Sequence, residues 1–224
     1  ILQKYKPDVI GLQEVFIEQL EYLADNLPNY GYVGVGRDNG IHKGEFNPIF
    51  HRTSLDPYDY GTFWLSGTPE ICSNTWGGLN RICTWINFKK EHFAFYNTHF
   101  ENSKAKIRLN SIPLLISQIK QHSQDCPVIV TGDFNFERNS KEYLLMAQYF
   151  QDIYSNDQEY RFKWTVTFHG FKEKTKSRFA WNGRKKIDYI WLKGNFRVLH
   201  SEIIYGNPKA SDHFPVLADI LISE

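Results

Sequence analysis

The apolar positions along this chain of 224 residues form two patterns, short runs and helical stripes. Short apolar or alternating runs bounded by Gly, Pro or charged residues are typical of strands. They predict strands at 8–15, 30–35, 47–51, 81–88, 92–100, 128–131, 187–192, 196–205 and 214–222 and, less regularly, at 56–65. The charged residues 89–91 separate two of these runs and predict the tip of a hairpin.

Apolar residues at helical spacing predict helices between the strands. The first stripe covers 15–27 and ends at Pro28. The second covers 107–119 and contains Pro113, so this helix either kinks there or begins later. Ser140 is the expected N-cap of a third helix that runs through Phe150. Many strands with few helices favour an α/β sandwich of two sheets face to face, with helices outside.

Composition limits the class of protein. Hydrophobic residues make up 42% and charged residues 23%, which is typical of a globular protein with a substantial core. Because the net charge is only +1, any affinity for a polyanion must come from a local patch. The three cysteines form no CxxC pair, which disfavours a cysteine zinc site; a bridge between Cys72 and Cys83 remains open. Neither a transmembrane stretch nor a signal peptide is visible, and the compartment stays undetermined.

Acidic residues close two of the predicted buried strands. Glu14 ends the strand 8–15, where a carboxylate suits a hard cation such as Mg²⁺ or Mn²⁺. The same residue could instead interact with the dipole of the following helix. Asp133 and Asn135 follow the strand 128–131 and are expected to share a face. The acid would orient a water and the amide would donate to a phosphate oxygen, unless both only form an Asx turn.

An acid and a histidine are adjacent in the segment 211–215, just before an apolar strand. Neighbours on an extended segment point to opposite faces, so Asp212 would reach a cation while His213 faces a substrate. Asp188 lies inside the apolar run 187–192, and a buried acid needs a partner. His213 is the best candidate, since a carboxylate orients a histidine and raises its basicity. The alternative is that His213 is a hydrogen-bonded residue of the core.

Two further features suit phosphate chemistry. His99 ends the strand 92–100 and would donate a proton to a leaving oxygen or bind phosphate, although histidines at strand ends are also common as plain surface residues. The segment 172–186 interleaves seven Lys and Arg residues with aromatic ones. That mixture suits phosphate contact and base stacking, and a solvated loop has the same composition.

Five motifs together resemble the endonuclease/exonuclease/phosphatase superfamily of metal-dependent phosphoesterases. They are LQEV at 12–15, NTHF at 97–100, GDFN at 132–135, IDYI at 187–190 and SDHFP at 211–215. The motifs follow the order of the family and span nearly the whole chain. The resemblance implies a four-layer α/β/β/α sandwich of two mixed sheets with outer helices, as in deoxyribonuclease I.

The resemblance also implies roles for the acids at the strand ends. Glu14 would be the principal ligand of Mg²⁺ or Mn²⁺, and Asp212 would lie near the metal. Asp188 would orient His213, and His213 together with Asp133 would position and deprotonate the attacking water.

The same comparison extends to residues that would contact or support the phosphate. Asn135 would bind the phosphate, and Arg81 matches a phosphate-contacting arginine on a looser alignment. His99 matches a histidine of deoxyribonuclease I-like and sphingomyelinase-like members, and Glu45 would support it. Family members usually begin with a strand that carries a metal-binding Asn, so we expect 1–224 to be a single domain without that N-terminal strand.

The expected activity is divalent-metal-dependent hydrolysis of a phosphate ester by in-line attack of water. A phosphodiester comes first, which makes nucleic acid the expected partner of a nuclease. The alternatives are a sphingomyelinase-like or sugar/lipid phosphatase activity, and a non-catalytic scaffold that binds a phosphorylated ligand. We expect a monomer without stable membrane insertion; the substrate, the physiological metal and the compartment stay open.

Overall fold

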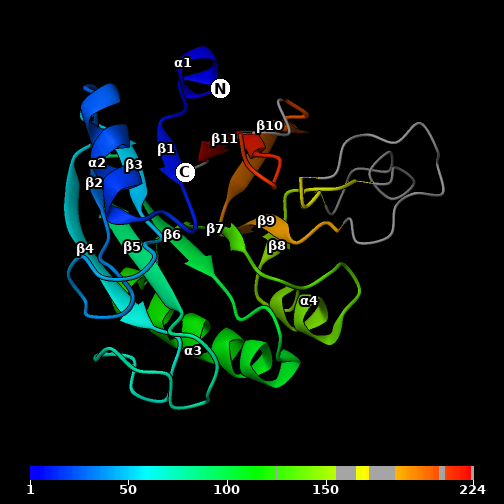
Figure 1. Ribbon diagram of the computed structural model, residues 1–224. Helices are drawn as coiled ribbons and strands as arrows, with labels where there is room; N and C mark the ends of the chain where they lie inside the picture. Colours follow the sequence, from blue (N-terminus) through cyan, green and yellow to red (C-terminus); the bar gives the residue numbers. More distant parts are fainter. Residues whose placement is uncertain (125, 155–164, 172–184, 207–209, 223–224) are drawn as a thin grey trace.

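A six-stranded mixed sheet forms the centre of the computed structural model, which describes residues 1–124, 126–154, 165–171, 185–206 and 210–222 (Figure 1). Along this sheet the order is β4, β5, β6, β7, β9, β8. Only the pair β6–β7 is parallel within it. The strands are β4 (Pro57–Trp64), β5 (Ile82–Phe88), β6 (Phe93–His99), β7 (Val128–Asp133), β8 (Gln151–Asp152) and β9 (Asp188–Lys193).

A second layer of strands faces this sheet. It consists of a three-stranded sheet in the order β1, β3, β2 and a two-stranded sheet of β10 and β11. Apolar side chains from both layers form the core between them, including fully buried Ile49, Ile86 and Phe88. The strands of this layer are β1 (Val9–Gly11), β2 (Tyr30–Val33), β3 (Ile49–Arg52), β10 (Phe196–Ile203) and β11 (Val216–Ile222).

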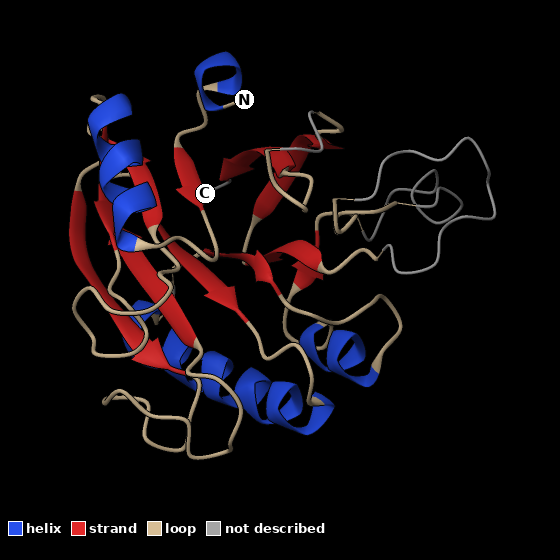
Figure 2. Ribbon diagram, viewed as in Figure 1, coloured by secondary structure: helices blue, strands red, loops and turns tan. Residues whose placement is uncertain are grey.

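Helices cover the outer faces of both layers (Figure 2). Helices α3 (Ala105–Ser123) and α4 (Lys141–Met146) pack on the large sheet through a core that includes Leu115 and Met146. Helix α2 (Ile17–Asn26) packs on the three-stranded sheet through Leu20. Helix α1 (Leu2–Tyr5) precedes β1. This order of layers confirms the α/β/β/α sandwich that the sequence predicts.

The bounds of two helices decide points that the sequence left open or placed differently. Helix α3 begins at Ala105 and contains Pro113, so of the two alternatives at this proline the later start is excluded. The helix continues because residues on both sides of the proline, such as Ile107 and Leu115, bury their side chains. Ser140 caps α4 by accepting from the Tyr143 amide, as predicted, but the helix ends at Met146 rather than at Phe150.

Asn97, fully buried on β6, joins the two layers beside the candidate residues. Its Nδ2 donates to the Leu12 carbonyl at 2.6 Å, and its Oδ1 accepts from Gln13 Nε2 at 2.6 Å. This contact requires glycine at position 11, because a Cβ on Gly11 would lie 2.6 Å from Asn97 Oδ1. The fold thus fixes the backbone immediately before Glu14.

The structure also answers two questions that the sequence raised, about disulfide bonds and about membrane-spanning helices. All three cysteines are free, so the bridge between Cys72 and Cys83 that the sequence left open is not formed. Among the described residues, none of the helices combines the length and the apolar character needed to cross a membrane.

Candidate active site

Sheet register brings three candidate side chains into one row. His99 at the end of β6 pairs with Asp133 at the end of β7, and Asp133 pairs with Asp188 at the start of β9. Residues opposite each other on neighbouring strands project to the same face. The three side chains therefore gather at one edge of the large sheet, although 89 positions separate the first from the last.

His213 joins this row from the segment before β11. Its Nδ1 lies 2.8 Å from Asp188 Oδ2, and its Nε2 lies 3.9 Å from Asp133 Oδ2. The contact between Asp188 and His213 that the sequence predicts is therefore present. Because Asp188 holds Nδ1, Nε2 is the nitrogen left to face Asp133 and a substrate.

Thr167 fixes the backbone on both sides of this pair, a role that no sequence pattern predicts. Its hydroxyl oxygen accepts from the amides of Ile187 and Asp188 at 3.0 and 3.1 Å. Its carbonyl accepts from the Phe214 amide at 2.7 Å. Thr167 is fully buried in an irregular segment, where no periodic pattern marks a structural role.

The charges of the row are coupled. Burial and then the charge of Asp188 raise the pKa of Asp133 to about 7, against the opposing effect of His213. Burial disfavours the charged form of His213, but the hydrogen bond and charge of Asp188 outweigh it and raise the pKa of His213 to about 9. Asp133 and His213 therefore both titrate near the pH at which most enzymes work, and the charge of each shifts the pKa of the other.

His99 lies between two carboxylates. Its Nε2 is 3.4 Å from Asp133 Oδ2, and its Nδ1 is 3.8 Å from Glu14 Oε1. Burial, followed by the charges of Arg81 and Arg37, holds the pKa of His99 well below its usual value. The imidazole is therefore neutral, which suits a hydrogen bond to phosphate.

Glu14 offers the most accessible carboxylate of the site. Its side chain is 60% exposed, and its backbone has a left-handed φ of 59°, a strained conformation for this residue type. Burial of part of the residue and the charges of Glu45 and Asp212 raise its pKa. Acidic groups that repel one another fit a divalent cation, because oxygen ligands suit Mg²⁺ and Mn²⁺ and a cation relieves the repulsion.

A second acidic group also has the spacing of metal ligands. Among the described residues, Asp133, Asp188 and His213 have ligand atoms within 4.8 Å of one another. The direct bond between Asp188 and His213 engages two of these atoms.

Asn135 forms the Asx turn that the sequence offered as one of two arrangements. Its amide nitrogen donates to Asp133 Oδ1 at 2.8 Å, which is an Asx turn, while Asp133 Oδ2 faces the two histidines. The Asn135 side chain donates to the Phe100 carbonyl at 3.0 Å. The turn and the site therefore coexist, and Asn135 has a left-handed φ of 52°.

Glu45 does not occupy the predicted place beside His99. Its carboxylate accepts from Arg37 Nη1 at 2.5 Å, and the carboxylates nearest to the His99 ring nitrogens belong to Glu14 and Asp133. Glu45 follows a loop rather than a strand, and the same loop brings Arg37 to it. The support that the resemblance implied is thus replaced by an ion pair.

Arg81 is almost completely buried next to this pair. Its Nε lies 3.8 Å from Glu101 Oε2, and its charge acts on Glu14, Asp133 and His99.

Most of the predicted basic loop, residues 172–184, lies outside the described residues. Lys185 is on the surface, 3.6 Å from Glu137. Lys186 is buried, and its Nζ lies 3.4 Å from Asp152 Oδ2. It therefore forms an ion pair in the core and is not a phosphate contact on the surface.

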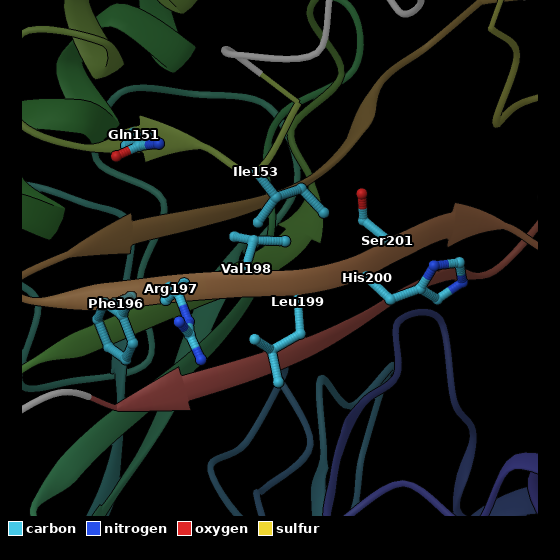
Figure 3. Close-up of a pocket in the computed structure, with 8 residues that line it drawn as sticks. All are labelled: Gln151, Ile153, Phe196, Arg197, Val198, Leu199, His200 and Ser201. Carbon is cyan, nitrogen blue, oxygen red and sulfur yellow. The ribbon is translucent and has the colours of Figure 1, made fainter.

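A separate hollow of about 540 Å³ lies along β10, lined by Gln151, Ile153 and residues 196–201 (Figure 3). It shares no residue with the site at the strand ends.

Two comparisons with known proteins cover nearly the whole chain. The sequence model of the Endonuclease/Exonuclease/phosphatase family matches residues 1–213. The solved structure of the mannosyl-6-phosphatase Bt3783 of Bacteroides thetaiotaomicron VPI-5482 is 31% identical, with a TM-score of 0.84 over 99% of this chain and 88% of that one.

Curated relatives match over part of their length. The uncharacterized protein L388 of Acanthamoeba polyphaga mimivirus is 31% identical over 149 residues, which cover 60% of this chain and 55% of that protein. Human tyrosyl-DNA phosphodiesterase 2 is 25% identical over 139 residues, which cover 60% of this chain and 34% of that protein. The chain thus spans about half or less of the length of these relatives.

Proposed function

The chain belongs to the endonuclease/exonuclease/phosphatase family, whose members are hydrolytic phosphoesterases, and we propose that it hydrolyses phosphate monoesters of sugars with the help of a divalent cation. The observation that carries the proposal is the row of Asp133, Asp188 and His213, in which Asp188 holds Nδ1 of His213 and leaves Nε2 toward the substrate. A scaffold that only binds phosphate has no need of such a pair.

In the proposed reaction, His213 Nε2 accepts a proton from a water that attacks phosphorus. Asp188 keeps the imidazole in the orientation that exposes Nε2 and stabilises the imidazolium that forms. Asp133 orients the water from the opposite side. The bond from phosphorus to the alcohol oxygen breaks in line with the attack, and the alcohol oxygen takes up a proton.

Glu14 and Asp212 are the residues that would hold Mg²⁺ or Mn²⁺. When bound, the cation would stabilise charge on the phosphoryl oxygens and lower the proton affinity of nearby His213 and Asp133. His99, which is neutral and buried, would donate a hydrogen bond to the phosphate.

The similarity over nearly the whole chain to a mannosyl-6-phosphatase supports a sugar phosphate as the substrate class. That similarity supports a sugar monoester more strongly than the shorter match to a tyrosyl-DNA phosphodiesterase supports a diester. A phosphodiester, which the sequence motifs put first, remains the second candidate, and the partial match to that phosphodiesterase favours it.

A panel of substrates tests the proposal. The chain is assayed with Mg²⁺ or Mn²⁺ against mannose 6-phosphate, glucose 6-phosphate, bis-p-nitrophenyl phosphate and a 5′-tyrosyl oligonucleotide. We expect phosphate release from the sugar esters that stops on addition of a chelator. Turnover that ignores the chelator would contradict the metal, and preference for a diester would move the second candidate to first place.

A further inference from the structure

Three buried nitrogens at one side of the site have no hydrogen-bond partner among the described residues: Arg37 Nε, Arg81 Nε and His99 Nδ1. Buried donors are almost always satisfied, so each such group requires an explanation. Arg37 and Arg81 lie on adjacent segments, because Asn80 Nδ2, next to Arg81, donates to Asp38 Oδ1, next to Arg37, at 3.1 Å. The charges of both arginines also act on His99. An anionic ligand that reaches all three would explain them together.

The backbone of Arg37 is held in place by the loop between β2 and β3. Its amide donates to the Glu45 carbonyl at 3.1 Å, and its own carbonyl accepts from Trp64 Nε1 at 2.8 Å. The side chain is only 12% exposed, and one guanidinium nitrogen bonds Glu45. Since a guanidinium has five N–H donors in a fixed fork, donors remain for a ligand.

Two buried guanidinium groups whose charges act on each other are unfavourable without anions. Burial and then the charge of Arg37 lower the pKa of Arg81, which expresses this repulsion. Glu45 and Glu101 offset part of it through their ion pairs with Arg37 and Arg81. Further negative charge brought by a substrate would offset more.

Phosphate monoesters and diesters differ in the charge that they bring. A monoester has three non-bridging oxygens and close to two negative charges at neutral pH, because its second pKa is about 6. A diester has two such oxygens and one charge. Two arginines beside one neutral histidine match the group with more oxygens and more charge.

We propose that Arg37 is a specificity-determining residue that contacts the terminal phosphoryl group and makes the site prefer dianionic phosphate monoesters to diesters. This inference rests on the proposed function and adds to it the residue that selects the substrate class.

The first test compares two substrates in the variant Arg37→Gln. We expect kcat/KM for mannose 6-phosphate to fall about 10- to 100-fold, the effect of one hydrogen bond to a charged group, and kcat/KM for bis-p-nitrophenyl phosphate to change less than about 3-fold. Arg52→Gln is the matched control, since Arg52 pairs with Asp8 away from the site. An equal loss on both substrates, or no loss on the monoester, would overturn the inference.

A second test separates contact with phosphate from neutralisation of Glu45. Binding of inorganic phosphate is measured by calorimetry, with and without Mg²⁺, for Arg37→Gln and for Arg37→Gln/Glu45→Gln. If Arg37 contacts phosphate, both variants bind it about 10-fold or more weaker than the wild type. Recovery of binding in the double variant would mean that Arg37 only neutralises Glu45, and the inference would fail.

These readouts distinguish the two proposals. A wild-type protein that binds phosphate through Arg37 but hydrolyses no ester would refute the proposed function alone. Turnover of monoesters that is indifferent to Arg37 would refute the inference alone. If Arg37→Gln does not fold, Arg37→Lys replaces it, since lysine keeps the positive charge but lacks the planar set of guanidinium donors. We again expect a selective fall of kcat/KM for the monoester. An unchanged ratio of kcat/KM between monoester and diester would refute the inference.

Discussion

Nδ1 of His213 lies 2.8 Å from Oδ2 of Asp188, although 25 positions separate the two residues. Asp188 opens β9 in register with Asp133, and His213 reaches the same edge from the segment before β11. One nitrogen of the imidazole is thereby engaged by the protein, and the other is directed to the place where β6 and β7 end. A histidine that acts as a general base needs this arrangement, in which one ring nitrogen is held by a carboxylate and the other is open to the substrate.

Removal of either member of this pair should abolish most turnover without unfolding the protein. We expect His213→Ala and Asp188→Asn each to lower kcat about 10²- to 10⁴-fold, and the double variant to be little worse than the more affected single one. His200→Ala is the matched control, since His200 is an exposed histidine on β10. A His213→Ala variant that keeps near-normal kcat would refute its role as the base.

Thr167 should matter for both stability and rate. Thr167→Val keeps the shape but removes the oxygen that accepts from the Ile187 and Asp188 amides, which should cost about 1–3 kcal/mol in the free energy of unfolding. Because Asp188 moves with its backbone, kcat should fall as well. Thr167→Ser retains the oxygen and should restore kcat. Urea unfolding and steady-state kinetics measure the two effects; equal behaviour of the Val and Ser variants would count against this role.

A side chain at position 11 should disturb the contact between the two layers and weaken the affinity for the metal. In Gly11→Ala the new Cβ would lie 2.4 Å from Thr131 Oγ1 and 2.6 Å from Asn97 Oδ1, so the backbone before Glu14 must shift. We expect a loss of about 1–3 kcal/mol in stability and a higher Mg²⁺ concentration for half-maximal activity. Gly206→Ala is the control, since its Cβ would meet nothing nearer than 3.8 Å. An unchanged metal requirement in Gly11→Ala would contradict the link.

The sequence could predict the residues that stand at the ends of strongly apolar strands. Asp133 and Asp188 are conspicuous there because an acid inside or just after a buried run needs a partner, and His213 lies beside another such run. The pattern of elements also predicted the sandwich, since many short apolar strands with few helices fit only a few known architectures.

Contacts made by loops could not be predicted in this way. Arg37 and Glu45 belong to a loop without periodicity, and their ion pair depends on how that loop folds back on itself. Thr167 lies in an irregular segment, and its hydroxyl matters only through the amides that happen to face it. Such partners follow from the three-dimensional arrangement, which sequence spacing does not encode.

A last prediction concerns the buried ion pair of Lys186 and Asp152. Lys186 Nζ lies 3.4 Å from Asp152 Oδ2 and above the rings of Tyr154 and Tyr189. Burial lowers the pKa of Lys186 to about 8, although the charge and hydrogen bond of Asp152 oppose this. In the unfolded chain a lysine titrates with a pKa of about 10.4.

The sign of the pH dependence follows from these two values. Between pH 8 and about 10 the unfolded chain binds more protons at Lys186 than the folded protein, so the contribution of this residue to the free energy of unfolding rises with pH. The variant Lys186→Met/Asp152→Asn removes both charges together and leaves no unpaired buried ion. We expect the stability of the wild type relative to this variant to increase by on the order of 1–3 kcal/mol from pH 7 to pH 10. Urea unfolding of both proteins across that range measures it. A difference that stays flat or decreases would mean that burial does not depress the pKa of Lys186.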